Sequence, residues 1–203
     1  MNMLLSILLA VTMMSDSLLF EAYGRENMEV WKELVASDVS GDAPVVSSVQ
    51  FSTLLYEYGY CGYIVAEAKK EGREALLPEA VGQVQQFRRH VEAAKGQLPP
   101  GHYEMYMSAV YVYELRLHES IHPVKSMNLA KEATRLAPGD PLVVSYYGTC
   151  LFYAPKPFGN KQEALQWFEK AKELFVGDEW QYCWVRQANE MYIEQCHEKL
   201  KKH

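Results

Sequence analysis

The chain has 203 residues, 49% hydrophobic and 23% charged, so it is long and apolar enough to bury a sizeable core and is not intrinsically disordered. Twelve glycines and nine prolines are too few for a loop-rich β protein of this size. The net charge of −6 argues against nucleic-acid binding, which needs a basic face to displace counterions from phosphates.

The first residues form an apolar segment without charge, Met3–Met14. This segment is shorter than the roughly 20 apolar residues that cross a bilayer, and it fits the hydrophobic region of a secretory signal peptide. We therefore predict a signal peptide over residues 1–16 and a protein that is exported, periplasmic or envelope-associated. The alternative is that the segment forms the first core helix of a cytoplasmic protein.

The rest of the chain is predicted to be helical, with short turns rich in glycine, proline and aspartate. Trp31 and Val35 lie on the apolar face of the first helix. Pro78 suits the start of a helix, and Asp140 and Asp178 suit the N-cap positions of two later helices. Because the breaks are short, neighbouring helices should form antiparallel pairs. The predicted helices cover residues 25–37, 45–72, 78–95, 103–119, 123–136, 141–153, 161–175 and 179–201.

Two helical segments share a pattern of small and aromatic residues. Residues 164–171 place Ala, Phe and Ala at offsets 0, 4 and 7, and residues 126–133 place Ser, Ala and Ala at the same offsets. Gly148 lies in the helix that precedes the first of these segments. This pattern resembles the tetratricopeptide repeat family, including its small exported bacterial members. Small residues let two helix backbones approach closely, and the aromatic ring fills the space beside them.

The resemblance implies an all-α fold of antiparallel helix-pair repeats, stacked as a short right-handed solenoid with a C-terminal capping helix. It implies a single domain over residues 17–203 and a non-enzymatic interaction module of the bacterial cell envelope. Such a module binds a protein or peptide partner in its concave groove. The chain departs from the family at position 114, where Glu114 stands in place of a small residue.

Candidate groove residues follow from the first helix of each pair, which lines the concave face in this family. Tyr56, Tyr60 and Tyr63 lie at offsets 0, 4 and 7 and share one helical face. Tyrosine offers a large contact area to a partner, although packing between helices is the alternative role for each ring. Carrying the family's groove positions onto this chain adds Tyr111, His118, Ser145, Thr149 and Phe152.

Residues 118–122 match the zinc-peptidase pattern HExxH, which makes a zinc enzyme the least favoured alternative function. The metal ligands would be His118 and His122. Pro123 follows at once and disfavours helical geometry at His122, so we predict no metal site, no cofactor and no catalytic residues. A solute-binding or transporter-accessory protein is the second alternative. We expect neither a nucleic-acid partner nor a stable membrane span once the signal peptide is removed.

The four cysteines fit no zinc module by their spacing. We predict buried free thiols that pack as small apolar groups, and a long-range disulfide is the alternative. Cys183 and Cys196 are expected to share the last helix, too far apart to bridge each other.

Overall fold

The computed structural model describes residues 16–25, 27–39, 47–118 and 123–201. Within these ranges every regular element is a helix and no strand occurs, which confirms the predicted all-α class. The predicted signal peptide lies outside the described residues, apart from Asp16. In the part of the chain that the structure describes, no helix is both long enough and apolar enough to cross a membrane.

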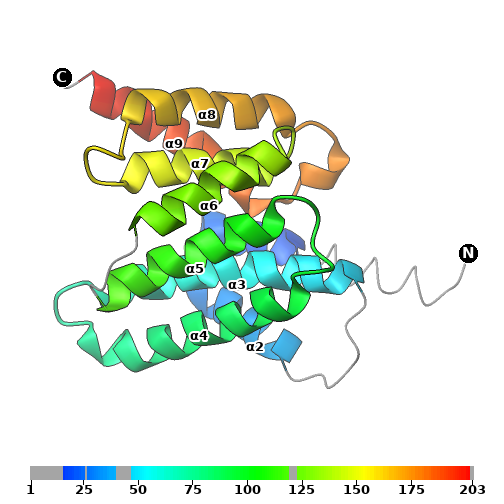
Figure 1. Ribbon diagram of the computed structural model, residues 1–203. Coiled ribbons are helices and arrows are strands. Elements are labelled where there is room, and N and C mark those ends of the chain that lie inside the picture. Colours follow the sequence, from blue (N-terminus) through cyan, green and yellow to red (C-terminus); the bar gives the residue numbers. More distant parts are fainter. Residues whose placement is uncertain (1–15, 26, 40–46, 119–122, 202–203) are drawn as a thin grey trace, which may run out of the picture. The chain divides into compact units, whose positions relative to one another are not determined.

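The helices follow one another with short connections (Figure 1). Both α6 and α7 have the predicted bounds, and α4, α5 and α8 begin and end within one residue of prediction over the described residues. Residues 16–24 are helical. The elements that follow are α2 (Met28–Val39), α3 (Ser47–Ala68), the 3₁₀ turn η1 (Glu74–Leu76), α4 (Leu77–Ala94), α5 (His102–His118), α6 (Pro123–Leu136), α7 (Pro141–Tyr153), α8 (Lys161–Leu174), the 3₁₀ turn η2 (Asp178–Trp180) and α9 (Trp184–Leu200).

The last helix differs from its prediction, because α9 begins at Trp184 and not at residue 179. The segment before it forms η2, in which the Trp180 ring packs edge-on against Phe175 at a centroid distance of 5.5 Å. Asp178 is therefore not an N-cap; it is the first residue of η2 and follows Gly177. The prediction that Cys183 shares a helix with Cys196 is also wrong, since Cys183 is the residue preceding α9.

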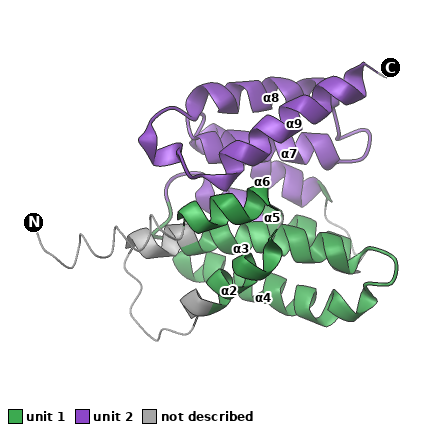
Figure 2. Ribbon diagram, turned by 180° about the vertical axis from the view of Figure 1, so that it is seen from behind, with its two compact units in different colours: residues 1–98, 109–123 green, residues 99–108, 124–203 purple. Residues whose placement is uncertain are grey.

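The described residues divide into two compact units, coloured separately in Figure 2. Unit 1 comprises residues up to Leu98 together with 109–123, and unit 2 comprises 99–108 together with the chain from Val124 onward. The residues of α5 are thus shared between the two units. Each unit has its own buried apolar core and is described separately below.

In unit 1, α3 packs against α2 and α4. The apolar side of α4 has a regular helical spacing, and its residues Ala80, Val84, Phe87, Val91 and Ala94 are buried. Trp31 of α2 is buried, and its indole N–H donates a 3.0 Å hydrogen bond to the Tyr56 carbonyl of α3. Burial of these apolar surfaces is the main stabilising contribution to the unit.

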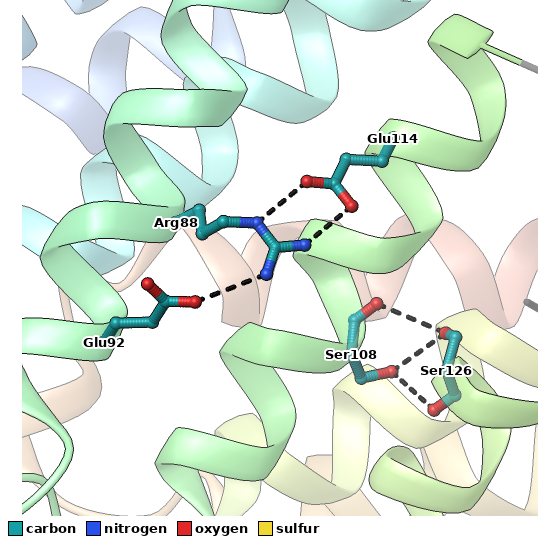
Figure 3. Close-up of polar contacts among 5 residues, drawn as sticks. All are labelled: Arg88, Glu92, Ser108, Glu114 and Ser126. Carbon is teal, nitrogen blue, oxygen red and sulfur yellow. Dashed lines mark hydrogen bonds and ion pairs between the residues drawn. The ribbon is translucent and has the colours of Figure 1, made fainter.

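An arginine joins α4 to the second half of α5 within unit 1 (Figure 3). Arg88 donates two hydrogen bonds to the carboxylate of Glu114, at 2.8 and 2.7 Å, and a third of 3.3 Å to Glu92. Its guanidinium also lies over the Tyr111 ring, 5.0 Å from the centroid. The hydrogen bonds to Glu114 raise the pKa of Arg88. Glu114, which departs from the small-residue pattern, therefore has a structural role as the partner of Arg88.

In unit 2, α7 and α8 approach each other closely at a glycine. A Cβ atom added at Gly148 would lie 2.8 Å from two ring carbons of Phe168. Phe168 and the alanines on either side of it in the predicted pattern, Ala164 and Ala171, are fully buried. This is the close helix approach that the sequence pattern predicts at this position.

The helix α6 presents the equivalent face, on which Ser126, Ala130 and Ala133 are buried. The Ser108 hydroxyl donates a 2.8 Å hydrogen bond to the Ser126 carbonyl, and the Ser126 hydroxyl donates to the Ser108 carbonyl at 3.2 Å (Figure 3). Tyr146 of α7 adds a third hydroxyl, which donates to Ser108 Oγ at 2.8 Å. These bonds satisfy polar groups that would otherwise be costly to bury.

The predicted N-cap of α7 is confirmed. Asp140 Oδ1 accepts hydrogen bonds from the backbone N–H groups of Leu142 and Val143, at 2.9 and 3.1 Å. The other carboxylate oxygen accepts a 2.8 Å bond from Nε2 of His102, a buried residue. Burial alone would raise the pKa of Asp140, but the hydrogen bond from His102 and those from the backbone outweigh it, and the pKa is lowered.

Candidate functional site

The predicted groove tyrosines of unit 1 lie at different depths. The rings of Tyr56 and Tyr60 are buried, while Tyr63 and Tyr111 are half-buried. The Tyr56 hydroxyl donates to Asp16, and the Tyr60 hydroxyl donates a 2.8 Å bond to Glu79 Oε1. Burial, followed by the bond to Glu79, raises the pKa of Tyr60.

The groove positions of unit 2 are mostly inside its core. Ser145 and Phe152 are buried, and half-buried Thr149 donates its hydroxyl to the Ser145 carbonyl at 3.1 Å. His118 is the last residue of α5, and its side chain is outside the described part of the chain. Since the candidates are divided between the two units, a common groove stays a prediction.

Phe152 contacts a cluster of aromatic rings, one of them exposed, that the sequence analysis did not identify. Tyr153, the next residue, ends α7 with 61% of its surface exposed, the highest exposure of any aromatic side chain in the described residues. Its ring packs edge-on against Phe152 at 5.0 Å and against Tyr192 of α9 at 5.8 Å. Tyr192 in turn stacks on the buried ring of Phe168, with centroids 5.2 Å apart. The buried rings therefore support an exposed one.

Two lysines border this cluster. Lys199, in the last turn of α9, places its Nζ 4.2 Å from the centroid of the Phe152 ring. Lys161, the first residue of α8, places its Nζ 6.0 Å from the same centroid. Attraction between an ammonium group and a ring face holds both lysines over the ring. Neither forms an ion pair with any carboxylate of the described residues. We call Phe152, Tyr153, Tyr192, Lys161 and Lys199 the aromatic–lysine surface.

Local structure explains why these five residues meet. Asn160 caps α8 by accepting a hydrogen bond from the backbone N–H of Glu163, at 3.1 Å. The Asn160 N–H also donates to the Leu151 carbonyl at 3.0 Å, which brings the start of α8 beside the end of α7. The helix α9 packs on both α8 and α7, and its last turns reach the same end. The connecting loop carries Phe158, which is 39% exposed.

The sequence contained only a weak signal for this surface. The adjacent rings at 152 and 153 end a helix, where one of two neighbouring side chains usually points to solvent. Tyr153 and Tyr192 are 39 positions apart, so their contact depends on how the helices pack.

The described residues contain no group of three or more histidine, cysteine, aspartate or glutamate side chains that could hold a metal ion. Of the predicted zinc pattern, residues 119–122 and the His118 side chain lie outside the described part. The four cysteines are free thiols, two of them buried and two half-buried. Burial raises the pKa of the Cys61 thiol and raises that of Cys150 to about 11, so both stay protonated and weakly nucleophilic at neutral pH.

No protein-family model matches the chain, and no curated protein matches its sequence. A solved structure does match its fold. The chain is similar to the HusA haemophore from Porphyromonas gingivalis, with a TM-score of 0.54 and 15% sequence identity. The match covers 83% of this chain and 84% of that one. At this identity the similarity establishes a common helical fold and nothing about ligands.

Proposed function

We propose that this chain is a non-catalytic binding protein that recognises a protein or peptide partner. Its helix pairs are of the tetratricopeptide type and stack as a short right-handed solenoid capped by α9. Support comes from the packing of Gly148 against Phe168 and from the burial of the small residues of α6 and α8 at matching offsets. Small residues at such positions set the distance between paired helices.

The aromatic–lysine surface is the observation that carries the proposal. Aromatic side chains supply much of the binding energy in protein interfaces, and Tyr153 offers an exposed ring held in place by its neighbours. Lys161 and Lys199 give this region positive charge in a protein of net charge −6. The partner is therefore expected to combine an apolar or aromatic group with carboxylates.

The proposal can be tested by affinity capture with the full-length chain. Cells that produce the tagged parent should yield a partner that the double variant Tyr153→Ser/Lys199→Gln fails to capture. The matched control is Val176→Ser/Lys131→Gln, which alters another exposed apolar residue and another exposed lysine of unit 2. The captured partner, once purified, should bind more weakly at high salt, because exposed charges are screened. Equal capture by the parent and the double variant would exclude this surface.

A second candidate function is the binding of a planar, carboxylate-bearing ring such as haem. The fold is similar to that of a haemophore, and the surface combines an aromatic ring with two lysines that pair with no carboxylate of the described residues. A cavity of about 100 Å³ lies in unit 2, smaller than the roughly 300 Å³ or more of sites that enclose larger ligands. This cavity is therefore too small to enclose haem, so the haem proposal rests on the aromatic–lysine surface. Titration with haemin should change its visible absorption with the parent and not with Tyr153→Ser/Lys199→Gln; no change with the parent excludes this function.

The proposed location is the bacterial cell envelope, on the basis of the apolar segment Met3–Met14. If residues 1–16 are a signal peptide, the mature protein in the source cell has lost them. Mass spectrometry of the protein purified from envelope and cytoplasmic fractions tests this. Recovery of the intact chain from the cytoplasm alone contradicts export.

A further inference from the structure

A second concave site lies in unit 2, between the end of α8 and the start of α9. The cavity of about 100 Å³ is lined by Lys172, Phe175, Arg186, Asn189 and Glu190. Lys172 and Phe175 are three positions apart near the end of α8, and the other three occupy one face of the first turns of α9. The aromatic–lysine surface includes Lys161 at the other end of α8, about 16 Å away along the helix axis at a rise of roughly 1.5 Å per residue. The two sites are therefore separate.

The charged side chains around this cavity are not paired with one another. Lys172, Arg186 and Glu190 form no ion pair within the described residues. Arg186 and Glu190 are four positions apart in α9, a spacing at which opposite charges can pair. The cavity therefore carries two cations and one anion, each available to a ligand.

A buried amide is among the groups that line this cavity. Asn189 is fully buried, and its Nδ2 donates a 2.9 Å hydrogen bond to the Phe168 carbonyl. That bond fixes the orientation of the amide, because a flipped amide would place two acceptors together. Asn189 Oδ1 then has no hydrogen-bond partner among the described residues, whereas buried acceptors in proteins are nearly always satisfied.

We propose that this cavity binds a small α-amino acid as its zwitterion. The ligand carboxylate binds Arg186 and Lys172, and the ligand ammonium group donates to Glu190 and to Asn189 Oδ1. A short side chain contacts the Phe175 ring, and the cavity volume restricts the ligand to a few heavy atoms. An inorganic anion would meet the carboxylate of Glu190 and leave Asn189 Oδ1 without a donor. A metal cation would meet the two positive side chains, so of these three ligand classes the zwitterion is the one that matches both sets of groups.

The test is a calorimetric titration of the full chain with L-alanine and L-serine, and separately with acetate. Arg186→Gln removes the cation that binds the ligand carboxylate, at a half-buried residue that forms no ion pair within the described residues. Glu190→Gln removes the carboxylate that binds the ligand ammonium group, at an exposed residue. Each variant should weaken binding by about 10- to 100-fold, the usual effect of a lost charged hydrogen bond. Arg116→Gln is the matched control and should bind like the parent, because Arg116 is an exposed arginine of α5 that forms no ion pair within the described residues.

Three results would overturn the proposal: no saturable binding of either amino acid at millimolar concentration, equal binding of acetate, or equal binding by Arg186→Gln. Circular dichroism of each variant checks that the helices are intact. Capture of the protein partner and binding of haemin both depend on the aromatic–lysine surface at the other end of α8. Failure of those proposals therefore leaves the amino-acid proposal testable, and its failure leaves them testable.

Discussion

The close approach of α7 to α8 can be tested by adding one methyl group at Gly148. In Gly148→Ala the new Cβ would lie 2.8 Å from Cδ1 and Cε1 of Phe168 and 3.2 Å from its Cγ. The ring cannot easily move aside, because it is fully buried and stacks on Tyr192. The helices must therefore separate, or the ring must leave its preferred rotamer.

Two opposing contributions determine how Gly148→Ala changes the free energy of unfolding. An added methyl group in a well-packed core costs about 1–3 kcal/mol. Replacing glycine by alanine inside a helix normally stabilises by about 0.5–1 kcal/mol. Gly148→Ala should therefore lower the free energy of unfolding, by up to about 2.5 kcal/mol. Gly82→Ala is the matched control, since Gly82 lies exposed inside α4 and its added Cβ would meet no atom within 4 Å other than those of its chain neighbours and its own helix backbone.

Urea denaturation followed by far-ultraviolet circular dichroism measures both variants against the parent. Gly82→Ala should raise the free energy of unfolding by about 0.5–1 kcal/mol, because it gains helix propensity without a clash. If Gly148→Ala stabilises the protein as Gly82→Ala does, the close approach at Phe168 is wrong. Amide hydrogen exchange locates the destabilisation expected in Gly148→Ala: exchange should become faster in α7 and α8, and the faster exchange should be confined to unit 2.

Three further predictions concern single side chains. His90 Nδ1 lies 2.9 Å from the fully buried carboxylate of Glu57, and their hydrogen bond raises the pKa of His90 above its ordinary value of 6.5. The stabilisation from this pair is complete below pH 6.5 and is lost as pH rises through the raised pKa, so the urea midpoint should fall between pH 6 and pH 9 less steeply in His90→Gln than in the parent. Asp140→Ala should lower the free energy of unfolding by about 2–4 kcal/mol, because it removes an N-cap and the acceptor of the buried His102 side chain. In the same urea assay, Asp140→Asn should lower the free energy of unfolding by less. Burial raises the pKa of the Cys150 thiol to about 11, so it should react with Ellman's reagent at pH 8 only after unfolding; rapid labelling of Cys150 itself in the native protein, located by peptide mass spectrometry, contradicts this.

Helix bounds were predictable from the sequence where local signals mark both ends. Pro123 and Pro141 each begin a helix as expected, since proline suits the first turn, and Asp140 caps α7. The start of α9 was not predictable in this way. Gly177 and Asp178 look like a helix start, but the contact between Trp180 and Phe175 accompanies a separate 3₁₀ turn.

The candidate site was less predictable than the fold, because its residues meet through packing. The helical spacing of Tyr56 and Tyr60 identifies a shared face and does not distinguish a core from a groove. Their hydroxyl partners, Asp16 and Glu79, lie 40 and 19 positions away in the sequence. Phe152 was identified as a candidate, yet the exposed ring beside it is that of Tyr153.

The measurement that tests the central claim most directly is affinity capture from the source cell with the full-length parent and Tyr153→Ser/Lys199→Gln, followed by binding of the purified partner to both. The account predicts a partner that binds the parent and the control Val176→Ser/Lys131→Gln. The same partner should not bind Tyr153→Ser/Lys199→Gln. A partner that binds all three proteins equally would contradict a binding role for the aromatic–lysine surface.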